Sequence, residues 1–124
     1  MRLKGVFKMK KVLIVEDDYY DRLNMKNKLE ASFEVFEADN LSDAESTFFG
    51  NPDIDLIIMD ACVPGHEPNS MRLVWKIKES GFKKPIIACS SIWQFSELLV
   101  QYGATHQAPK HKAAELAIEL LTNT

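Results

Sequence analysis

The chain has 124 residues, 46% of them hydrophobic, which suffices for one domain around one buried core. The 15 basic and 18 acidic residues give a formal net charge of −3. The chain therefore lacks the excess of positive charge that is typical of nucleic-acid-binding proteins. No apolar run approaches the ~20 residues that cross a bilayer, and the two cysteines are too few for a disulfide framework. We therefore expect a cytoplasmic domain with free thiols that does not enter a membrane.

The chain begins with a segment that lacks a secondary-structure pattern. Residues 1–9 are basic but contain neither the apolar core nor the small-residue cleavage site of a signal peptide. We predict that they form an N-terminal extension and that residues 10–124 form the folded domain.

Buried strands and amphipathic helices alternate in the first half of the domain. Residues 12–15 are β-branched and uniformly apolar, as in a strand that is buried on both faces. Apolar residues with helical spacing predict a helix over residues 21–31, and a strand follows over residues 33–38. A weaker helix is predicted over residues 42–49, before a cluster of turn-forming residues.

The second half of the domain continues this alternation of strand and helix. Its predicted elements, in chain order, cover residues 56–59, 71–80, 86–89, 95–102, 105–108 and 113–121. Five strands that alternate with five helices indicate right-handed βαβ crossovers. The pattern therefore predicts an α/β fold with a doubly wound parallel sheet of five strands.

Polar residues follow four of the predicted strands. They are Glu16, Asp17 and Asp18 after the first strand, Asp60 after the third, Ser90 after the fourth and Lys110 after the fifth. In a parallel sheet the carboxyl ends of the strands meet at one edge, where ligands bind. We expect these side chains to converge there, with Asp18 in the simpler role of a helix N-cap.

The charges of these residues predict a cation site. Two like charges ~4 Å apart repel by about 4 kcal/mol at an effective dielectric constant near 20, so three adjacent carboxylates require compensation. A divalent cation and the Lys110 ammonium together balance Glu16, Asp17 and Asp60. Mg²⁺, or Mn²⁺ in its place, is the natural partner of carboxylate oxygens. A carboxylate in such a site can act as a nucleophile that forms an aspartyl phosphate.

These motifs resemble the receiver domains of bacterial two-component response regulators, from about Lys11 to Leu121. The matching segments are residues 11–18, residues 55–60 with residues 63–65, residues 85–91, and the pair Gly103-Ala104 followed by Lys110. The resemblance implies a flavodoxin-like (βα)5 fold with strand order 2-1-3-4-5.

The resemblance also implies a role for each site residue. Asp60 would accept a phosphoryl group from a sensor histidine kinase or a phosphotransfer protein. The implied metal ligands are Asp17, Asp60, Glu16 and the backbone carbonyl of Cys62, and Lys110 and Ser90 are implied to hold the phosphoryl oxygens. The implied output is a separate partner protein that contacts the face of the fourth helix, fifth strand and fifth helix. We expect a signalling module that is not an enzyme and is a monomer or a weak dimer.

The sequence departs from the family pattern around its switch. Gln107 stands where the family usually has a tyrosine or phenylalanine. His111 follows Lys110 in place of the usual cis-proline, and a trans bond is expected because a cis bond before another residue costs ~2.5–4 kcal/mol. The loop after Asp60 is longer than usual and lacks the usual glycine at its end, and residues 90–103 form a shorter stretch than usual.

Two other functions stay open at the level of sequence. The first is a pseudo-receiver, an interaction module of this fold that signals without phosphate, which the altered switch favours. The second, more remote, is a phosphatase of the haloacid-dehalogenase type, which also uses an aspartate nucleophile. That class needs a second aspartate two residues after the first, and here Cys62 occupies the position.

Overall fold

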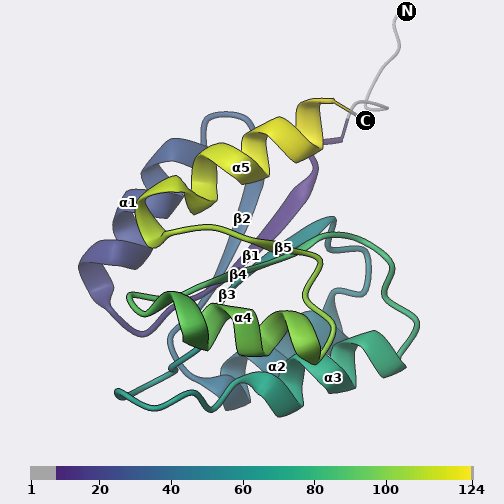
Figure 1. Ribbon diagram of the computed structural model, residues 1–124. Helices are drawn as coiled ribbons and strands as arrows, with labels where there is room; N and C mark the ends of the chain where they lie inside the picture. The colour runs from purple at the N-terminus through teal and green to yellow at the C-terminus, as the bar shows by residue number, and fades with distance from the viewer. Residues whose placement is uncertain (1–7, 124) are drawn as a thin grey trace, which may run out of the picture.

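A computed structural model describes residues 8–123, so most of the predicted N-terminal extension lies outside the described residues. Strands and helices alternate through the described chain (Figure 1). In chain order they are β1 (Lys11–Val15), α1 (Tyr19–Leu29), β2 (Glu34–Ala38), α2 (Leu41–Gly50), β3 (Leu56–Asp60), α3 (Met71–Glu79), β4 (Ile86–Cys89), α4 (Trp93–Gln101), β5 (His106–Gln107) and α5 (Lys110–Thr122). Among the described residues, no helix combines the length and apolar character that a membrane span requires.

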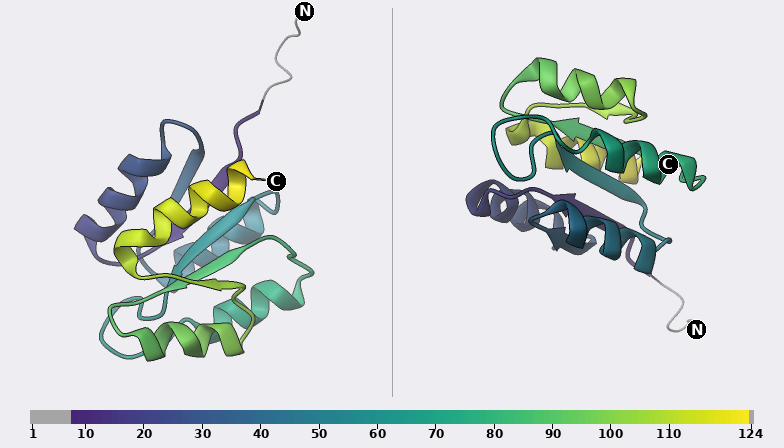
Figure 2. Two further views of the ribbon diagram at one scale, coloured as in Figure 1. Left: turned by 45° about the horizontal axis from the view of Figure 1, so that its top comes forward. Right: turned by 90° about the horizontal axis from the view of Figure 1, so that it is seen from below.

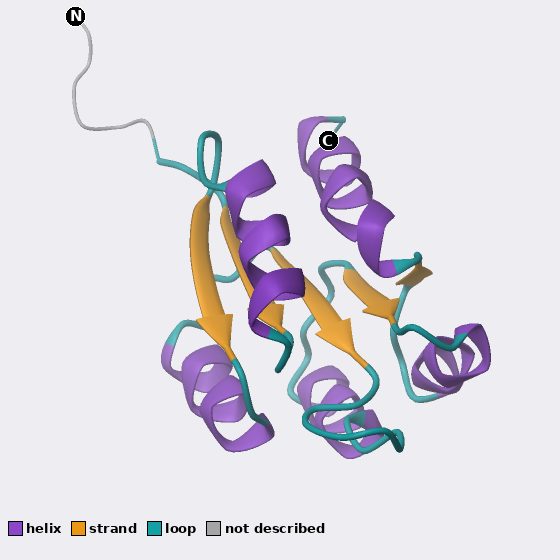
Figure 3. Cartoon of the chain, turned by 90° about the vertical axis from the view of Figure 1, so that its left-hand side faces the viewer, coloured by secondary structure: helices purple, strands orange, loops and turns teal. Residues whose placement is uncertain are grey.

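The strands form one parallel sheet in the order β2-β1-β3-β4-β5, which confirms the predicted fold class. Figure 3 shows the strand arrows pointing the same way, toward the loops that carry the polar residues. β3 and β4 are buried along their whole length, because their residues before Asp60 and throughout β4 are apolar and suit a strand with helices on both sides. β5 has only two residues and is shorter than the predicted strand over residues 105–108.

Helices cover both faces of the sheet. α1 and α5 lie on one face, and α2, α3 and α4 lie side by side on the other (Figures 1 and 2). Successive side chains of a strand point to opposite faces, so β1 contributes to two separate cores. Leu13 and Val15 pack with α2, α3 and α4, whereas Val12 and Ile14 pack with α1 and α5.

The starts of α1 and α5 bear on the site, and both come earlier than the sequence predicted. α1 begins at Tyr19 rather than at residue 21, and Asp18 is its N-cap, as predicted. Oδ2 of Asp18 accepts the N–H of Asp21 at 2.9 Å. α5 begins at Lys110 itself, directly after Pro109, rather than near residue 113. The Lys110–His111 bond is trans, as expected. Lys110 therefore extends from the first turn of a helix.

Candidate functional site

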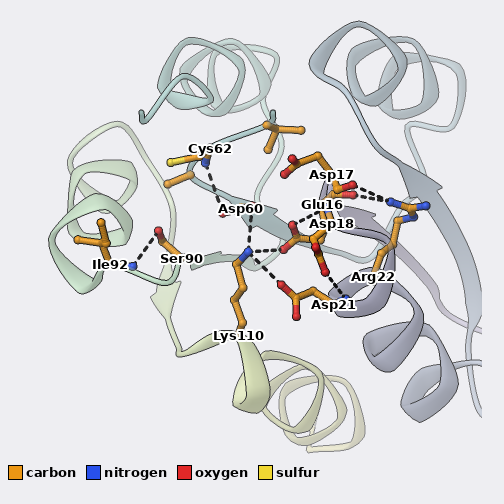
Figure 4. A network of polar contacts seen from close by, with 12 residues as sticks. Glu16, Asp17, Asp18, Asp21, Arg22, Asp60, Cys62, Ser90, Ile92 and Lys110 are labelled. Carbon is orange, nitrogen blue, oxygen red and sulfur yellow. Dashed lines mark hydrogen bonds and ion pairs between the residues drawn. The ribbon is translucent and has the colours of Figure 1, made fainter. Parts of the chain in front are cut away.

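The strand register brings the predicted polar residues to one edge of the sheet. Val15 pairs with Met59, so Glu16 and Asp17 emerge beside Asp60, the last residue of β3. Asp60 in turn pairs with Cys89, which places Ser90 next to it. A cavity of about 290 Å³ opens here, and its lining includes Asp17, Asp60, Cys62, Ser90, Ile92 and Lys110. Figure 4 shows the side chains around it.

Three carboxylates form an acidic cluster beside this cavity. One oxygen each of Glu16, Asp17 and Asp60 lies within 4.8 Å of the other two. Glu16 is 0% exposed and Asp60 is 2% exposed. Oε2 of Glu16 accepts the N–H of Asp18 at 3.0 Å, and the buried Oε1 lies 3.0 Å from the Lys110 ammonium. Three grouped carboxylates, two of them buried, offer the oxygen ligands that suit a hard divalent cation such as Mg²⁺ or Mn²⁺.

The Lys110 ammonium lies among three carboxylates. Its Nζ is 3.0 Å from Glu16 Oε1 and 3.4 Å from Asp60 Oδ2, and both contacts are ion pairs. It also donates a hydrogen bond to Oδ2 of Asp21, at 3.3 Å. Burial would lower the pKa of Lys110, but the negative charges of Asp60 and Glu16 outweigh burial and raise it. The ammonium therefore stays charged and neutralises part of the cluster.

Glu16 and Asp60 hold their protons more tightly than ordinary carboxyl groups. Burial, followed by repulsion from Asp60, raises the pKa of Glu16 to about 8. Burial also raises the pKa of Asp60, although Lys110 opposes the effect. A bound divalent cation would favour the ionised carboxylates and displace these protons.

Arg22 supports the turn between β1 and α1. Its Nη1 donates to the backbone oxygen of Glu16 at 2.9 Å, and its Nε pairs with Glu37 of β2 at 3.2 Å. The guanidinium therefore holds the segment that presents the acidic pair. Sequence reasoning assigned Arg22 no such role, because its contacts depend on the packing of α1 against β2.

Asn69 and Ser70 hold the long loop that follows Asp60, and sequence reasoning missed both. Ser70 is fully buried, and its hydroxyl donates to the backbone oxygen of Asp60 at 2.7 Å. Asn69 closes the loop: its Oδ1 accepts the N–H of Val63 at 2.8 Å, and its Nδ2 donates to the Val63 oxygen at 3.0 Å. Ser70 has φ −97°, so the missing family glycine is not needed here. The one signal in the sequence was a hydroxyl residue in place of that glycine.

Ser90 is placed between the cavity and α4. Its Oγ accepts the N–H of Ile92, the residue that precedes α4, at 3.2 Å. The Cys62 N–H donates to Asp60 Oδ1 at 3.3 Å on the other side of the cavity (Figure 4). Among the described residues, the Ser90 hydroxyl makes no hydrogen bond to Asp60 or Lys110.

Gln107 replaces the family's aromatic residue with a hydrogen-bonded amide. Its Nε2 donates to Oγ of Ser96 at 2.8 Å and to the backbone oxygen of Trp93 at 3.1 Å. Ser96 is fully buried in α4 and itself donates to the Trp93 oxygen at 2.8 Å. Gln107 thus ties β5 to the first turn of α4.

Comparison with known proteins identifies the fold. No protein-family model and no curated protein matches the chain. The N-terminal domain of an uncharacterized Wolinella succinogenes protein is 27% identical, with a TM-score of 0.76 over 93% of this chain and 92% of that one. A response regulator from Thermotoga maritima is 24% identical, with a TM-score of 0.73 over 92% of this chain and 98% of that one. A CheY-like receiver domain protein from Methanospirillum hungatei is 21% identical, with a TM-score of 0.75 over 94% and 93% of the two chains. The chain has the fold of response-regulator receiver domains, as its sequence motifs indicated.

Proposed function

We propose that this chain is a response-regulator receiver that accepts a phosphoryl group on Asp60. The observation that carries the proposal is the position of Asp60, a residue that is 2% exposed and lies between the acidic pair and the Lys110 ammonium. Solved structures that share the fold include response regulators and receiver domains, which supports the same general role here. We assign the receiver domain to residues 10–124.

The proposed donor is a phosphohistidine on a sensor histidine kinase or a phosphotransfer protein. An Asp60 oxygen forms the new O–P bond while the N–P bond breaks, and the imidazole leaves with the electron pair and takes up a proton. Negative charge spreads over the phosphoryl oxygens during the transfer. Lys110 is close enough to offset this charge, and the Ser90 hydroxyl lines the same cavity as a further donor.

The carboxylates of Glu16, Asp17 and Asp60 would hold Mg²⁺ or Mn²⁺, together with the backbone carbonyl of Cys62 that the family resemblance implies. When bound, the cation supplies positive charge beside the phosphoryl oxygens. Arg22 holds the backbone of Glu16, and Ser70 holds the backbone of Asp60. These two hydrogen bonds keep the acidic pair and Asp60 next to each other.

The proposed output is a change at the face of α4, β5 and α5 that a separate partner protein reads. The hydrogen bond from the Ile92 N–H to the Ser90 hydroxyl links the site to the start of α4. When Ser90 turns to the phosphoryl group, this bond breaks and the first turn of α4 is released. The signal therefore reaches α4 without the aromatic residue that Gln107 replaces.

A pseudo-receiver is the second candidate, and Gln107 favours it. The two hydrogen bonds from Gln107 to α4 hold β5 and α4 together. If these bonds keep the face of α4 and β5 in one conformation, that face would suit an interaction module that binds its partner without a phosphorylation switch. The set of Asp60, Lys110 and the acidic pair around a cavity favours phosphorylation more strongly.

Intact-mass spectrometry after incubation with acetyl phosphate and Mg²⁺ tests the proposal. We expect one added phosphoryl group on the wild-type chain and none on Asp60→Asn. Asp53→Asn is a matched control, because Asp53 is an exposed carboxylate that pairs with Lys11 outside the site. Labelling that persists in Asp60→Asn would refute the acceptor, and a wild type that stays unlabelled would favour the pseudo-receiver.

A further inference from the structure

Asp21 contacts the site but has no role in the proposed phosphoryl transfer. It lies in the first turn of α1, and its Oδ2 accepts a hydrogen bond from the Lys110 ammonium at 3.3 Å. We propose that Asp21 is a positioning residue that holds Lys110 on the α1 side of the site and competes with the phosphoryl group for it. This inference rests on the proposed function and adds a means by which the chain sets its own threshold for phosphorylation.

The backbone around Asp21 is well placed to hold a cation from α5. The N–H of Asp21 is bound by the Asp18 cap at 2.9 Å, so the start of α1 is fixed. Lys110 is the first residue of α5, which packs beside α1 on the same face of the sheet. The Asp21–Lys110 contact therefore joins the first turns of two neighbouring helices (Figure 4).

The Lys110 ammonium is shared among three carboxylates. Its Nζ lies 3.0 Å from Glu16 Oε1, 3.3 Å from Asp21 Oδ2 and 3.4 Å from Asp60 Oδ2. Asp21 therefore shares the ammonium with the proposed acceptor. Since an aspartyl phosphate carries more negative charge than the carboxylate, phosphorylation strengthens the pull of Asp60 on Lys110.

Exposure makes Asp21 the partner that can release Lys110. The Asp21 side chain is 40% exposed, whereas that of Glu16 is fully buried. A released Asp21 carboxylate is hydrated, so losing the ion pair costs it little. A released Glu16 would stay buried beside Asp60 without its counter-charge. Lys110 therefore exchanges Asp21 for the phosphoryl group and keeps Glu16.

Binding of beryllofluoride, a phosphoryl analogue, with Mg²⁺ tests this competition by calorimetry. We expect Asp21→Asn to bind the analogue about two- to fivefold more tightly than wild type, the range expected for a partly exposed ion pair. Asp18→Asn is the matched control. Asp18 lines the same cavity, and its substitution also removes one negative charge. Among the described residues it forms no ion pair or hydrogen bond with Lys110, and asparagine keeps the helix cap. Its affinity should change less than twofold at physiological salt.

A double-mutant cycle with Lys110→Gln provides a readout that does not require phosphate. In urea unfolding, Asp21→Asn should destabilise the chain that contains Lys110 and should not destabilise Lys110→Gln. Unchanged or weaker analogue binding by Asp21→Asn, or an equal gain in Asp18→Asn, would refute the competition. If the wild type binds no beryllofluoride, the proposed function fails. The double-mutant cycle then still tests the Asp21–Lys110 contact, because additive effects of the two substitutions on unfolding would show that Asp21 does not hold Lys110.

Discussion

Glu16→Gln tests the acidic cluster most directly, because it removes a buried ionisable group and keeps the shape of the side chain. The pKa of Glu16 is raised from 4.5 to about 8, so the native state binds this proton more tightly than the unfolded state. The associated stability is fully present below pH 4.5 and is lost as the pH rises to about 8. Glutamine cannot ionise, so the variant escapes this loss.

The magnitude of this effect follows from the difference between the two pKa values. For one such group, the free energy of unfolding falls by roughly 3 kcal/mol between pH 5 and pH 8. Without divalent cations, we expect Glu16→Gln to gain that amount relative to wild type over this range. Saturating Mg²⁺ should remove most of the gain, since the cation replaces the proton in the wild type.

Urea unfolding followed by far-UV circular dichroism at pH 5 and pH 8, with EDTA or Mg²⁺, measures both effects. Glu79→Gln serves as the control, because Glu79 is exposed at the end of α3, away from the site. A constant difference between wild type and Glu16→Gln across the pH range would refute the buried-charge reasoning. If the difference depends on pH but Mg²⁺ leaves it unchanged, the result would refute the cation site and leave the buried-charge reasoning standing.

Three further changes probe the metal ligands, the lifetime of the phosphoryl group and the loop. Asp17→Ala should weaken Mg²⁺ binding more than Glu16→Gln in a calorimetric titration, since Asp17 is the implied direct ligand, and equal affinities for wild type and Asp17→Ala would remove that role. Cys62→Asn or Ile92→Glu should speed dephosphorylation about tenfold, because either side chain could orient the hydrolytic water and one charged hydrogen bond in the transition state contributes roughly 1.5–3 kcal/mol. Decay followed by mass spectrometry checks this, and unchanged rates in both variants would exclude a water path beside these residues. Ser70→Ala should lower the free energy of unfolding by about 1–2 kcal/mol, because it removes a buried donor to the Asp60 backbone oxygen. An unchanged urea midpoint would show that the bond adds no stability.

Local sequence pattern alone predicted the alternation of elements and the fold class. Short apolar segments bounded by turn residues, such as those of β3 and β4, favour strands buried on both faces, and the carboxyl ends of parallel strands meet at one edge of the sheet. The convergence of Glu16, Asp17 and Asp60 followed from the same rule. The Asp18 cap was predicted as well, because a cap depends on residues a few positions apart.

Tertiary structure alone decided which groups touch within the site. Asp21 and Lys110 are separated by 89 positions in the chain and meet because α1 packs against α5. The bond from Ser70 to the Asp60 backbone depends on the path of a long loop, and the two bonds from Gln107 depend on the placement of α4 over β5. Periodicity and residue type determine which face of an element is buried. They carry no information about which polar atoms of two packed elements come within hydrogen-bond distance, because side-chain packing across the whole domain sets those separations.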